Sequence, residues 1–352
     1  MNILITGIGG PTPRSIAKTI RAKYPDYRII GMDVNPKAIG FYLPGLLDKG
    51  YVAPRVNEPN YWSFIQSIIE SERIDLAFVQ PELEVIAWGN YFNEKGTYPC
   101  PVLIPPVELA LPLMDKSLMS DVLKDTSYIP KTLSITHDDH KLEQIGQEIG
   151  YPCWIRANQG SGGLGSLKIA GASSLDPWLL VHSDIPEFTV SEFLPGRHLA
   201  NQMLYLDGEY VKGASLQCVE YVMASIAPSK VTGNTSYGRF LNEENYLSFC
   251  DEVITYMCEK LHVRAHGVFS FDTKDDHLGN PKVTEINIRH MAYTGIMADV
   301  GFDLISDTIT FLTEGPEHIV RDQNFRYNKP YSFLRDVDIE PIIVDDRELR
   351  KK

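Results

Sequence analysis

The chain carries, at residues 269–290, the sequence Phe-Ser-Phe-Asp-Thr-Lys-Asp-Asp-His-Leu-Gly-Asn-Pro-Lys-Val-Thr-Glu-Ile-Asn-Ile-Arg-His, and this stretch decides the fold. One apolar run ends at Asp272, and a second carries Glu285, Asn287 and Arg289, with a Gly/Asn/Pro turn between them. The pattern predicts two adjacent strands joined as a hairpin. Because alternate residues of a strand share a face, we expect the polar side chains of the second run to point the same way, across from Asp272.

The polar groups of this hairpin are of a kind that binds metal ions. Asp272, Glu285 and Asn287 offer two carboxylates and an amide oxygen, and Mg²⁺ prefers such hard oxygen ligands, with water and phosphate completing its shell. Arg289 would then meet a phosphoryl group held by the metal. A solvated polar strand face is the alternative, and it is the commoner one when only spacing is known.

Length and composition bound the class of protein. A chain of 352 residues predicts two or three domains, and 43% hydrophobic with 22% charged residues is typical of a soluble globular protein. The net charge of −13 opposes broad contact with a phosphate backbone, so no nucleic-acid partner is expected. The net charge does not exclude an anionic small ligand, because the binding site for such a ligand needs only a few local cations and a metal.

Cysteine use and hydropathy indicate a compartment. Five cysteines without C-x-x-C spacing support neither a disulfide framework nor a zinc knuckle. The sequence shows no signal-peptide pattern at its start and no run of about 18 apolar residues. We therefore expect a cytoplasmic protein with reduced cysteines and no membrane contact.

The first hundred residues alternate between strand and helix patterns. Strands are predicted at 3–6, 29–32 and 76–79, and helical patterns lie between them, which indicates a parallel sheet covered by helices. Thr12 is the predicted N-cap of the first helix, with Pro13 at the first helical position. Thr12 also stands where the dinucleotide motif G-x-G-x-x-G requires glycine, so a structural domain whose loops help to hold a substrate is favoured over an NAD site.

A proline-containing stretch at 103–112 predicts a linker, and a new helix opens at 114–117. There Lys116 opposes the helix dipole, which weakly favours a role facing phosphate. Further on, a glycine-rich loop at 158–166 lies between predicted strands at 153–156 and 167–169. Backbone N–H groups of such a loop can approach a ligand closely, and Arg156 precedes it; a floppy loop is the equal alternative.

The remainder predicts a second β-rich region. Strand patterns at 188–194, 199–206 and 210–218 include an Asp-Gly turn, and a polar segment at 230–239 is expected to be a mobile loop over a site. Helices are expected at about 243–261 and 304–312.

Four segments together resemble the ATP-grasp family, close to the group of the carbamoyl phosphate synthetase large subunit and biotin carboxylase. The resemblance covers roughly residues 111–312, and its four segments lie at 111–117, 153–166, 191–198 and 284–289. It implies a Rossmann-like α/β domain at 1–110 followed by an ATP-grasp fold of two α+β subdomains. The small subdomain would span 111–190 and carry the glycine flap, the large one 191–335 with the metal site, and 336–352 would form a tail.

The resemblance also implies roles for particular residues. Backbone groups of Glu192 and Leu194 would contact adenine and Phe193 would pack on its ring, while His198 is either a ribose contact or an ordinary polar strand residue. The metal set would hold two Mg²⁺ ions, with Mn²⁺ as a substitute, and Arg289 would face the transferred group. The residues expected to hold the phosphates are Lys116, Arg156, Ser161, Gly162, Gly163 and Gly165.

Three positions depart from the commoner family pattern. His198 stands where many members carry a ribose-binding glutamate, although the biotin carboxylase branch also has histidine. Arg156 replaces a lysine, which keeps the charge, as in the carbamoyl phosphate synthetase branch. Asp272 replaces a glutamate and is one methylene shorter, which would shift a metal or interpose a water.

The activity implied by the resemblance is that of an ATP-dependent ligase joining a small-molecule carboxylate to an amine through an acyl phosphate. Two alternatives stay open: phosphorylation of a carboxylate or carbamate as in carbamoyl phosphate synthetase, and a non-catalytic ATP-binding regulator. Core or surface roles are favoured over proton transfer for His262, His266 and His290. A homodimer is a fair expectation for a cytoplasmic enzyme.

Overall fold

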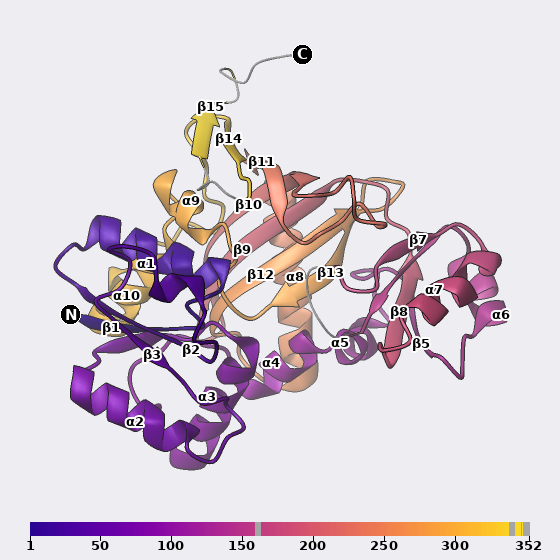
Figure 1. The fold of residues 1–352 in the computed structure, drawn as a ribbon. Helices are drawn as coiled ribbons and strands as arrows, with labels where there is room; N and C mark the ends of the chain where they lie inside the picture. The colour runs from indigo at the N-terminus through magenta and orange to yellow at the C-terminus, as the bar shows by residue number, and fades with distance from the viewer. Residues whose placement is uncertain (159–162, 338–341, 346, 348–352) are drawn as a thin grey trace.

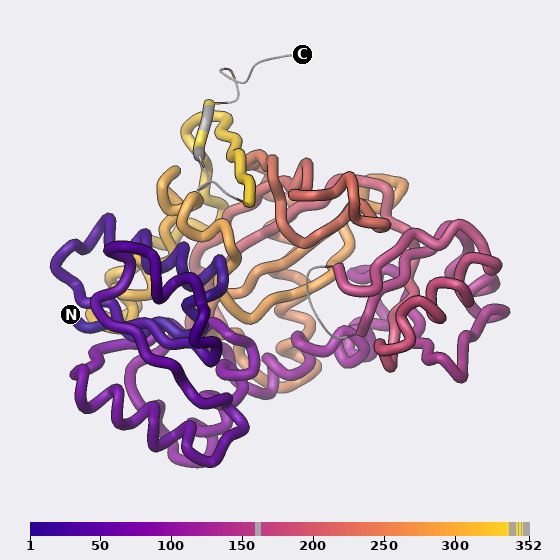
Figure 2. The backbone as a smooth tube through the Cα atoms, in the orientation of Figure 1, coloured from indigo at the N-terminus to yellow at the C-terminus, as the bar shows by residue number. Residues whose placement is uncertain are grey.

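The computed structural model describes residues 1–158, 163–337, 342–345 and 347. Its strands form three sheets, one parallel and two antiparallel, which confirms the expected α/β and α+β class. Figures 1 and 2 show the N-terminal domain at one end, a large sheet in the middle and a small sheet at the other end. None of the helices in this described part is long and apolar enough to cross a membrane.

The N-terminal domain is built on a parallel sheet of order β3-β2-β1-β4. The predicted alternation is confirmed, but one strand, β3, was not predicted because its residues are mostly exposed and give no apolar pattern. The prediction for the first helix was wrong in one detail, since Gly10 is the N-cap and Pro11 and Thr12 already belong to the first turn. The elements are β1 (Asn2–Thr6), α1 (Pro11–Lys23), β2 (Arg28–Asp33), β3 (Lys49–Val52), α2 (Tyr61–Glu72), β4 (Leu76–Phe78) and α3 (Glu82–Lys95).

The small sheet has the order β5-β8-β6-β7 and is antiparallel throughout. It buries Ile155, Phe188 and Val190 against the helices on one face. Strand β8 crosses the subdomain boundary expected at 190, so the change from small to large sheet falls between residues 192 and 198. The elements are β5 (Thr132–Thr136), α6 (Leu142–Gln144), a π-helical turn (Ile145–Ile149), β6 (Cys153–Ala157), β7 (Leu167–Ile169), α7 (Leu175–Val181) and β8 (Glu187–Glu192).

The large sheet has seven strands in the order β13-β12-β9-β10-β11-β14-β15. One of them, β11, overturns an expectation, because it occupies part of the segment predicted as a mobile loop. Strand β15 lies in the C-terminal segment, for which the sequence made no prediction of secondary structure. Gly238 interrupts the apolar pattern of β11, and it is needed there because a Cβ would collide with the Phe333 ring. The strands are β9 (His198–Leu206), β10 (Glu209–Tyr221), β11 (Thr235–Leu241), β12 (Gly267–Asp275), β13 (Pro281–Asn287), β14 (Tyr331–Leu334) and β15 (Ile342–Asp345).

The N-terminal domain and the large sheet share one hydrophobic core. A single buried cluster joins Trp88 of α3 with Val253 of α8 and Phe269 of β12. On another side, the backbone N–H of Gly295 donates to Ser15 Oγ at 3.0 Å, which joins α9 to α1. Helix α1, which follows the glycine loop, is thereby held against α9, which follows β13 in the chain. The remaining helices are α4 (Val107–Met114), α5 (Lys116–Leu123), α8 (Glu244–Leu261), α9 (Thr294–Asp299) and α10 (Leu304–Glu314), with 3₁₀ turns at Ile39–Phe41, Ala172–Ser174 and Pro316–His318.

Candidate active site

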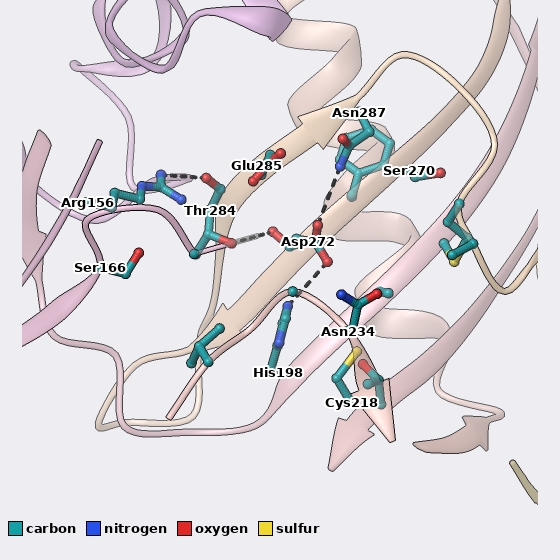
Figure 3. A pocket seen from close by; sticks show the side chains of 18 of the residues that line it. Arg156, Ser166, His198, Cys218, Asn234, Ser270, Asp272, Thr284, Glu285 and Asn287 are labelled. Atoms are coloured by element: carbon teal, nitrogen blue, oxygen red, sulfur yellow. Dashed lines mark hydrogen bonds and ion pairs between the residues drawn. The ribbon is translucent and has the colours of Figure 1, made fainter. Parts of the chain in front are cut away.

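The hairpin of β12 and β13 forms as predicted. Asp272 pairs with Glu285 across it, and Ser270 pairs with Asn287. On its other side β12 pairs with β9, so the hairpin is held within the sheet. The predicted metal set therefore lies on neighbouring rungs of two adjacent strands, with the side chains gathered as Figure 3 shows.

Asp272 is the centre of this cluster. Its Oδ2 accepts from Asn287 Nδ2 at 3.5 Å, and its Oδ1 lies 3.2 Å from His198 Nε2 (Figure 3). Its backbone carbonyl accepts from Thr284 Oγ1 at 3.0 Å. Contacts from three directions fix the carboxylate on the cavity side of the sheet.

Glu285 lies between charges of both signs. Burial raises the pKa of its carboxyl, and the neighbouring Asp272 raises it further, whereas Lys116 and Arg156 act in the opposite direction. Two carboxylates this close disfavour each other's ionised form, and a divalent cation between them would reverse that effect. The electrostatics of the pair therefore fit a metal site.

Among the described residues, no three His, Cys, Asp or Glu side chains are grouped so that they could hold a metal alone. Here the third protein oxygen comes from the Asn287 amide. A site with so few protein ligands leaves most of the coordination to water and phosphate oxygens, which is how Mg²⁺ is usually held beside a nucleotide. The residues present fit Mg²⁺ in that sense.

Two cations approach the carboxylates from the small sheet and its preceding helix. Arg156 leaves β6 and donates from Nη2 to the Thr284 carbonyl at 2.7 Å (Figure 3). Lys116 opens α5, where Asp115 caps the helix, and its Nζ donates to the Asn158 carbonyl at 3.3 Å. Burial lowers the pKa of both cations, and Glu285 opposes that lowering in each case.

Arg289 lies just beyond the end of β13. Its Nη1 donates to the His290 carbonyl at 3.1 Å, and its Nη2 lies 3.4 Å from Glu82 Oε1 in the first turn of α3. The ion pair joins the segment that follows β13 to the N-terminal domain. Arg289 is thus positioned where the large sheet and the N-terminal domain meet.

Glu192 ends β8, Phe193 and Leu194 follow it in the segment before β9, and all three line the cavity. The Phe193 ring lies 4.1 Å from Lys168 Nζ and 5.5 Å from Lys274 Nζ. Lys274 also lines the cavity and was missed by the sequence reasoning. The signal was available, because Lys274 follows Asp272 by two residues on a strand and so shares its face.

His198 interacts with protein groups at both ring nitrogens. Besides Asp272 at Nε2, its Nδ1 forms a hydrogen bond with the Tyr221 hydroxyl. The ring also stacks on Tyr221 with centroids 5.9 Å apart. In this geometry His198 supports the Asp272 carboxylate, a role that the sequence pattern did not indicate.

The glycine loop is described only in part. Ser161 and Gly162 lie outside the described residues. Gly163 has φ +77° and lines the cavity, and a Cβ there would come within 2.8 Å of the Val231 carbonyl oxygen. Gly165 has φ +60°, its carbonyl accepts from Trp178 Nε1 at 2.9 Å, and it does not line the cavity. The described end of the loop is therefore packed against the segment before β11.

A cavity of about 630 Å³ joins these groups. His262, His266 and His290 do not line it, in keeping with core or surface roles, and burial lowers the pKa of His290 to about 4. Residues of the N-terminal domain, which no motif indicated individually, close its far end. The predicted residues that line it are Lys116, Arg156, Gly163, Glu192, Phe193, Leu194, His198, Asp272, Glu285, Asn287 and Arg289.

Comparisons of sequence find no relatives, since no protein-family model and no curated protein sequence matches the chain. Comparison with solved structures, in contrast, finds many similar chains. N5-carboxyaminoimidazole synthetase from Staphylococcus aureus, complexed with ADP, superposes with a TM-score of 0.70 over 95% of this chain and 81% of that one, at 13% identity. The chain has the ATP-grasp fold.

Two further ATP-grasp structures match over 95% of this chain, each at 12% identity. The biotin carboxylase domain dimer of the Hydrogenobacter thermophilus 2-oxoglutarate carboxylase, with MgADP, ADP and bicarbonate, gives a TM-score of 0.68 and is covered over 74%. An L-amino acid ligase from Bacillus licheniformis gives 0.65 and is covered over 79%. Identity this low establishes the ATP-grasp fold and leaves activity to be argued from the site.

Proposed function

We propose that this ATP-grasp chain is an ADP-forming ligase that joins a carboxylate to an amine through an acyl phosphate. One observation carries the proposal: around a single cavity, Lys116 and Arg156 face the set of Asp272, Glu285 and Asn287. Cations on one side and metal-binding oxygens on the other are what a triphosphate with Mg²⁺ requires.

The first chemical step activates the acid. An oxygen of the substrate carboxylate attacks the γ-phosphorus of ATP, the bond from that phosphorus to the β–γ bridging oxygen breaks, and its electron pair leaves with ADP. Lys116 and Arg156 neutralise the phosphate oxygens, and Arg289 orients the carboxylate against the phosphoryl group. The protein needs no nucleophile of its own, because the substrate provides it.

The second step forms the amide. The amine nitrogen attacks the acyl carbon, the bond from that carbon to the phosphate oxygen breaks, and phosphate leaves with the electron pair and takes up the amine proton. Departing phosphate is itself a base, so a histidine in the cavity is not required for this step. The cavity wall has only to hold the amine in line with the acyl carbon.

Metal and nucleotide would be held by residues already described. Mg²⁺ bound to Asp272, Glu285 and Asn287, as two ions or with Mn²⁺ in its place, would supply Lewis-acid stabilisation of the charge that develops on the phosphates. At the other side, adenine would pack on Phe193 and meet the backbone of Glu192 and Leu194.

The compared structures support the reaction class. The synthetase from Staphylococcus aureus was solved with ADP, and the carboxylase domain was solved with MgADP and bicarbonate. The third is named as an L-amino acid ligase. Each description names a nucleotide, an acid or a ligase reaction, in agreement with the chemistry inferred here.

Oxygen tracing tests the proposal directly. With carboxylates labelled by ¹⁸O, incubation with ATP, Mg²⁺ and an amine pool is expected to place one ¹⁸O in the released phosphate, and hydroxylamine is expected to trap the activated acid as a hydroxamate. Unlabelled phosphate would show that water attacks ATP and would refute the acyl phosphate. Labelled phosphate without need of an amine would favour a carboxylate kinase, and no turnover with any acid would favour the regulator.

A further inference from the structure

The cavity has a second end that the nucleotide chemistry does not use. Beyond Arg289 it is lined by residues from segments 7–13, 80–81 and 291–293, and we call this part the acceptor end. Among the described residues that line it none is charged, although Lys116, Arg156 and Arg289 line the rest of the cavity. The proposed function places ATP at the other end and the carboxylate beside Arg289, so we assign this end to the amine.

The loop at the acceptor end looks like a phosphate cradle but lacks the donors of one. The N–H of Gly9 donates to Asp33 Oδ2 at 2.8 Å, and that of Gly10 donates to the Gly7 carbonyl at 2.9 Å. Helix α1 then begins at Pro11, and Pro13 is its third residue, so two of its first three residues have no N–H. Phosphate sites at helix starts depend on those N–H groups.

Behind Thr6 and Gln80 the nearest titratable groups are acidic, whereas the cations Arg14 and Arg335 lie beside Gly10 and Tyr293 at the edges of the acceptor end. The Thr6 hydroxyl accepts from the Gln80 N–H at 3.2 Å and hydrogen-bonds to the buried Glu84. Burial raises the pKa of Glu84 to about 7, and the nearby Asp33 raises it in the same direction. A phosphate bound close to these groups would meet the repulsion that already disfavours the Glu84 carboxylate.

One polar atom at the acceptor end still needs a donor. Gln80 lines the cavity with 5% of its surface exposed, and among the described residues its Oε1 has no hydrogen-bond partner. Its Nε2 is engaged by the Val79 carbonyl at 3.2 Å. A buried acceptor without a partner costs about 1–3 kcal/mol, which a ligand N–H would recover.

We infer that the acceptor substrate is an amine without a phosphate group, and that Gln80 Oε1 accepts one of its N–H hydrogens. The inference rests on the proposed ligase function. It separates this chain from a structurally similar N5-carboxyaminoimidazole synthase of Aspergillus clavatus (TM-score 0.64, 11% identity), which was solved with ADP and 5-aminoimidazole ribonucleotide, an amine that carries a phosphate. Fold alone would not predict that difference.

Matched amine pairs test the inference. With ATP, Mg²⁺ and a panel of carboxylates, ADP release is measured with ethanolamine and O-phosphoethanolamine, L-serine and O-phospho-L-serine, and glucosamine and glucosamine 6-phosphate. The expected result is a kcat/KM at least about tenfold higher for the unphosphorylated member of any pair that is used. Equal use, or preference for the phosphorylated member, would overturn the inference.

Hydroxylamine trapping separates the two possible failures. If a hydroxamate forms and only phosphorylated amines are joined, or none of the panel is joined, the ligase chemistry stands and the inference about the amine is overturned. If no carboxylate yields a hydroxamate or labelled phosphate, the proposed function fails and the inference fails with it.

Substitution of Gln80 tests the contact itself. Gln80→Leu is expected to raise KM for the amine by about tenfold and to leave KM for ATP unchanged, whereas Gln80→Glu, which keeps an acceptor oxygen, is expected to bind the amine at least as well. Gln66→Leu, at an exposed position of α2, is the matched control. An unchanged KM for the amine in folded Gln80→Leu protein would overturn the contact.

Discussion

The two ends of the cavity handle charge in opposite ways. One end is lined by Lys116, Arg156, Asp272 and Glu285, and we call it the nucleotide end because the proposed function places ATP there. Arg156 approaches the two carboxylates from the small sheet, and Lys116 approaches them from α5. At the acceptor end no lining residue among those described is charged, and Glu84 is held behind the wall. Under the proposed function, charge is therefore concentrated where a phosphoryl group would move, and the choice of amine would be left to shape, hydrogen bonding and the exclusion of anions.

The largest effect is expected from removing the central charge of the nucleotide end. Glu285→Gln keeps the shape but weakens metal binding, so kcat for ADP release is expected to fall by roughly 10³-fold. Circular dichroism and the unfolding temperature should be unchanged or improved, since repulsion with Asp272 is relieved. Glu252→Gln, exposed on α8, is the control. If Glu285→Gln keeps its rate of ADP release, Glu285 does not have the proposed role in metal binding, and the contrast between the two ends of the cavity loses its basis.

At the acceptor end, the cost of ionising the buried Glu84 carboxyl is expected to make the stability of the protein depend on pH. Glu84 has a folded pKa of about 7 against a usual value of 4.5, so it stabilises the folded state most below pH 4.5. As pH rises from 4.5 to 7 the unfolded chain ionises first, and about 3 kcal/mol of unfolding free energy is lost. Urea denaturation should therefore show Glu84→Gln gaining stability relative to the wild type over that interval.

The exposed Glu70 on α2 provides the reference for this measurement. Glu70→Gln should follow the wild-type pH profile within error. A Glu84→Gln profile that runs parallel to it from pH 4.5 to 8 would show that the Glu84 carboxyl titrates normally, and its ionisation would then not cost stability in the way described.

A smaller loss is expected when one cation of the nucleotide end is removed. Arg156→Met should lower kcat by roughly 10²-fold, because a positioned donor that meets charge in the transition state is lost. Arg156→Lys should recover part of the rate through its charge. Arg239→Met, at an exposed residue of β11, is the control. If the substitution changes only KM for the amine, Arg156 acts at the acceptor end, and its assignment to the nucleotide end is wrong.

The smallest effect is expected at His198, which contacts Asp272 and would act on the proposed metal only through that carboxylate. His198→Leu should weaken Mn²⁺ binding by about tenfold in a titration followed by electron paramagnetic resonance, since a supporting contact to a metal ligand is lost. Tyr221→Phe should do the same to a lesser degree. His318→Leu, at an exposed site, is the control. Weaker ADP binding with unchanged Mn²⁺ affinity would instead assign His198 to the ribose.

Much of the nucleotide end could be predicted from sequence because its residues follow the period of a strand. Asp272, Glu285 and Asn287 lie on two paired strands, and local alternation fixed their common face. Arg156 and the glycine loop were found for the same reason, at the tip of a short hairpin. Local patterns predict local geometry well.

The acceptor end could not be predicted in this way, because it is formed by distant segments. Gln80 follows a strand without any motif, and only the packing of the N-terminal domain on the large sheet brings it to the cavity. The contact of Tyr221 with His198 could not be predicted either, because it depends on how β9 and β10 pair. Strand β11 was missed because Gly238 conceals its alternation.

The hydrophobic core shared by α3, α8 and β12 has a consequence for how new substrate preferences could arise. Part of the core of the N-terminal domain is formed by residues of the large-sheet region. The domain therefore could not simply be replaced by a homologous domain from another protein, because the replacement would have to pack against Val253 and Phe269 as well as within itself. Selection would then act through single substitutions in the loops after β1 and β4, and laboratory evolution of this chain would best begin there.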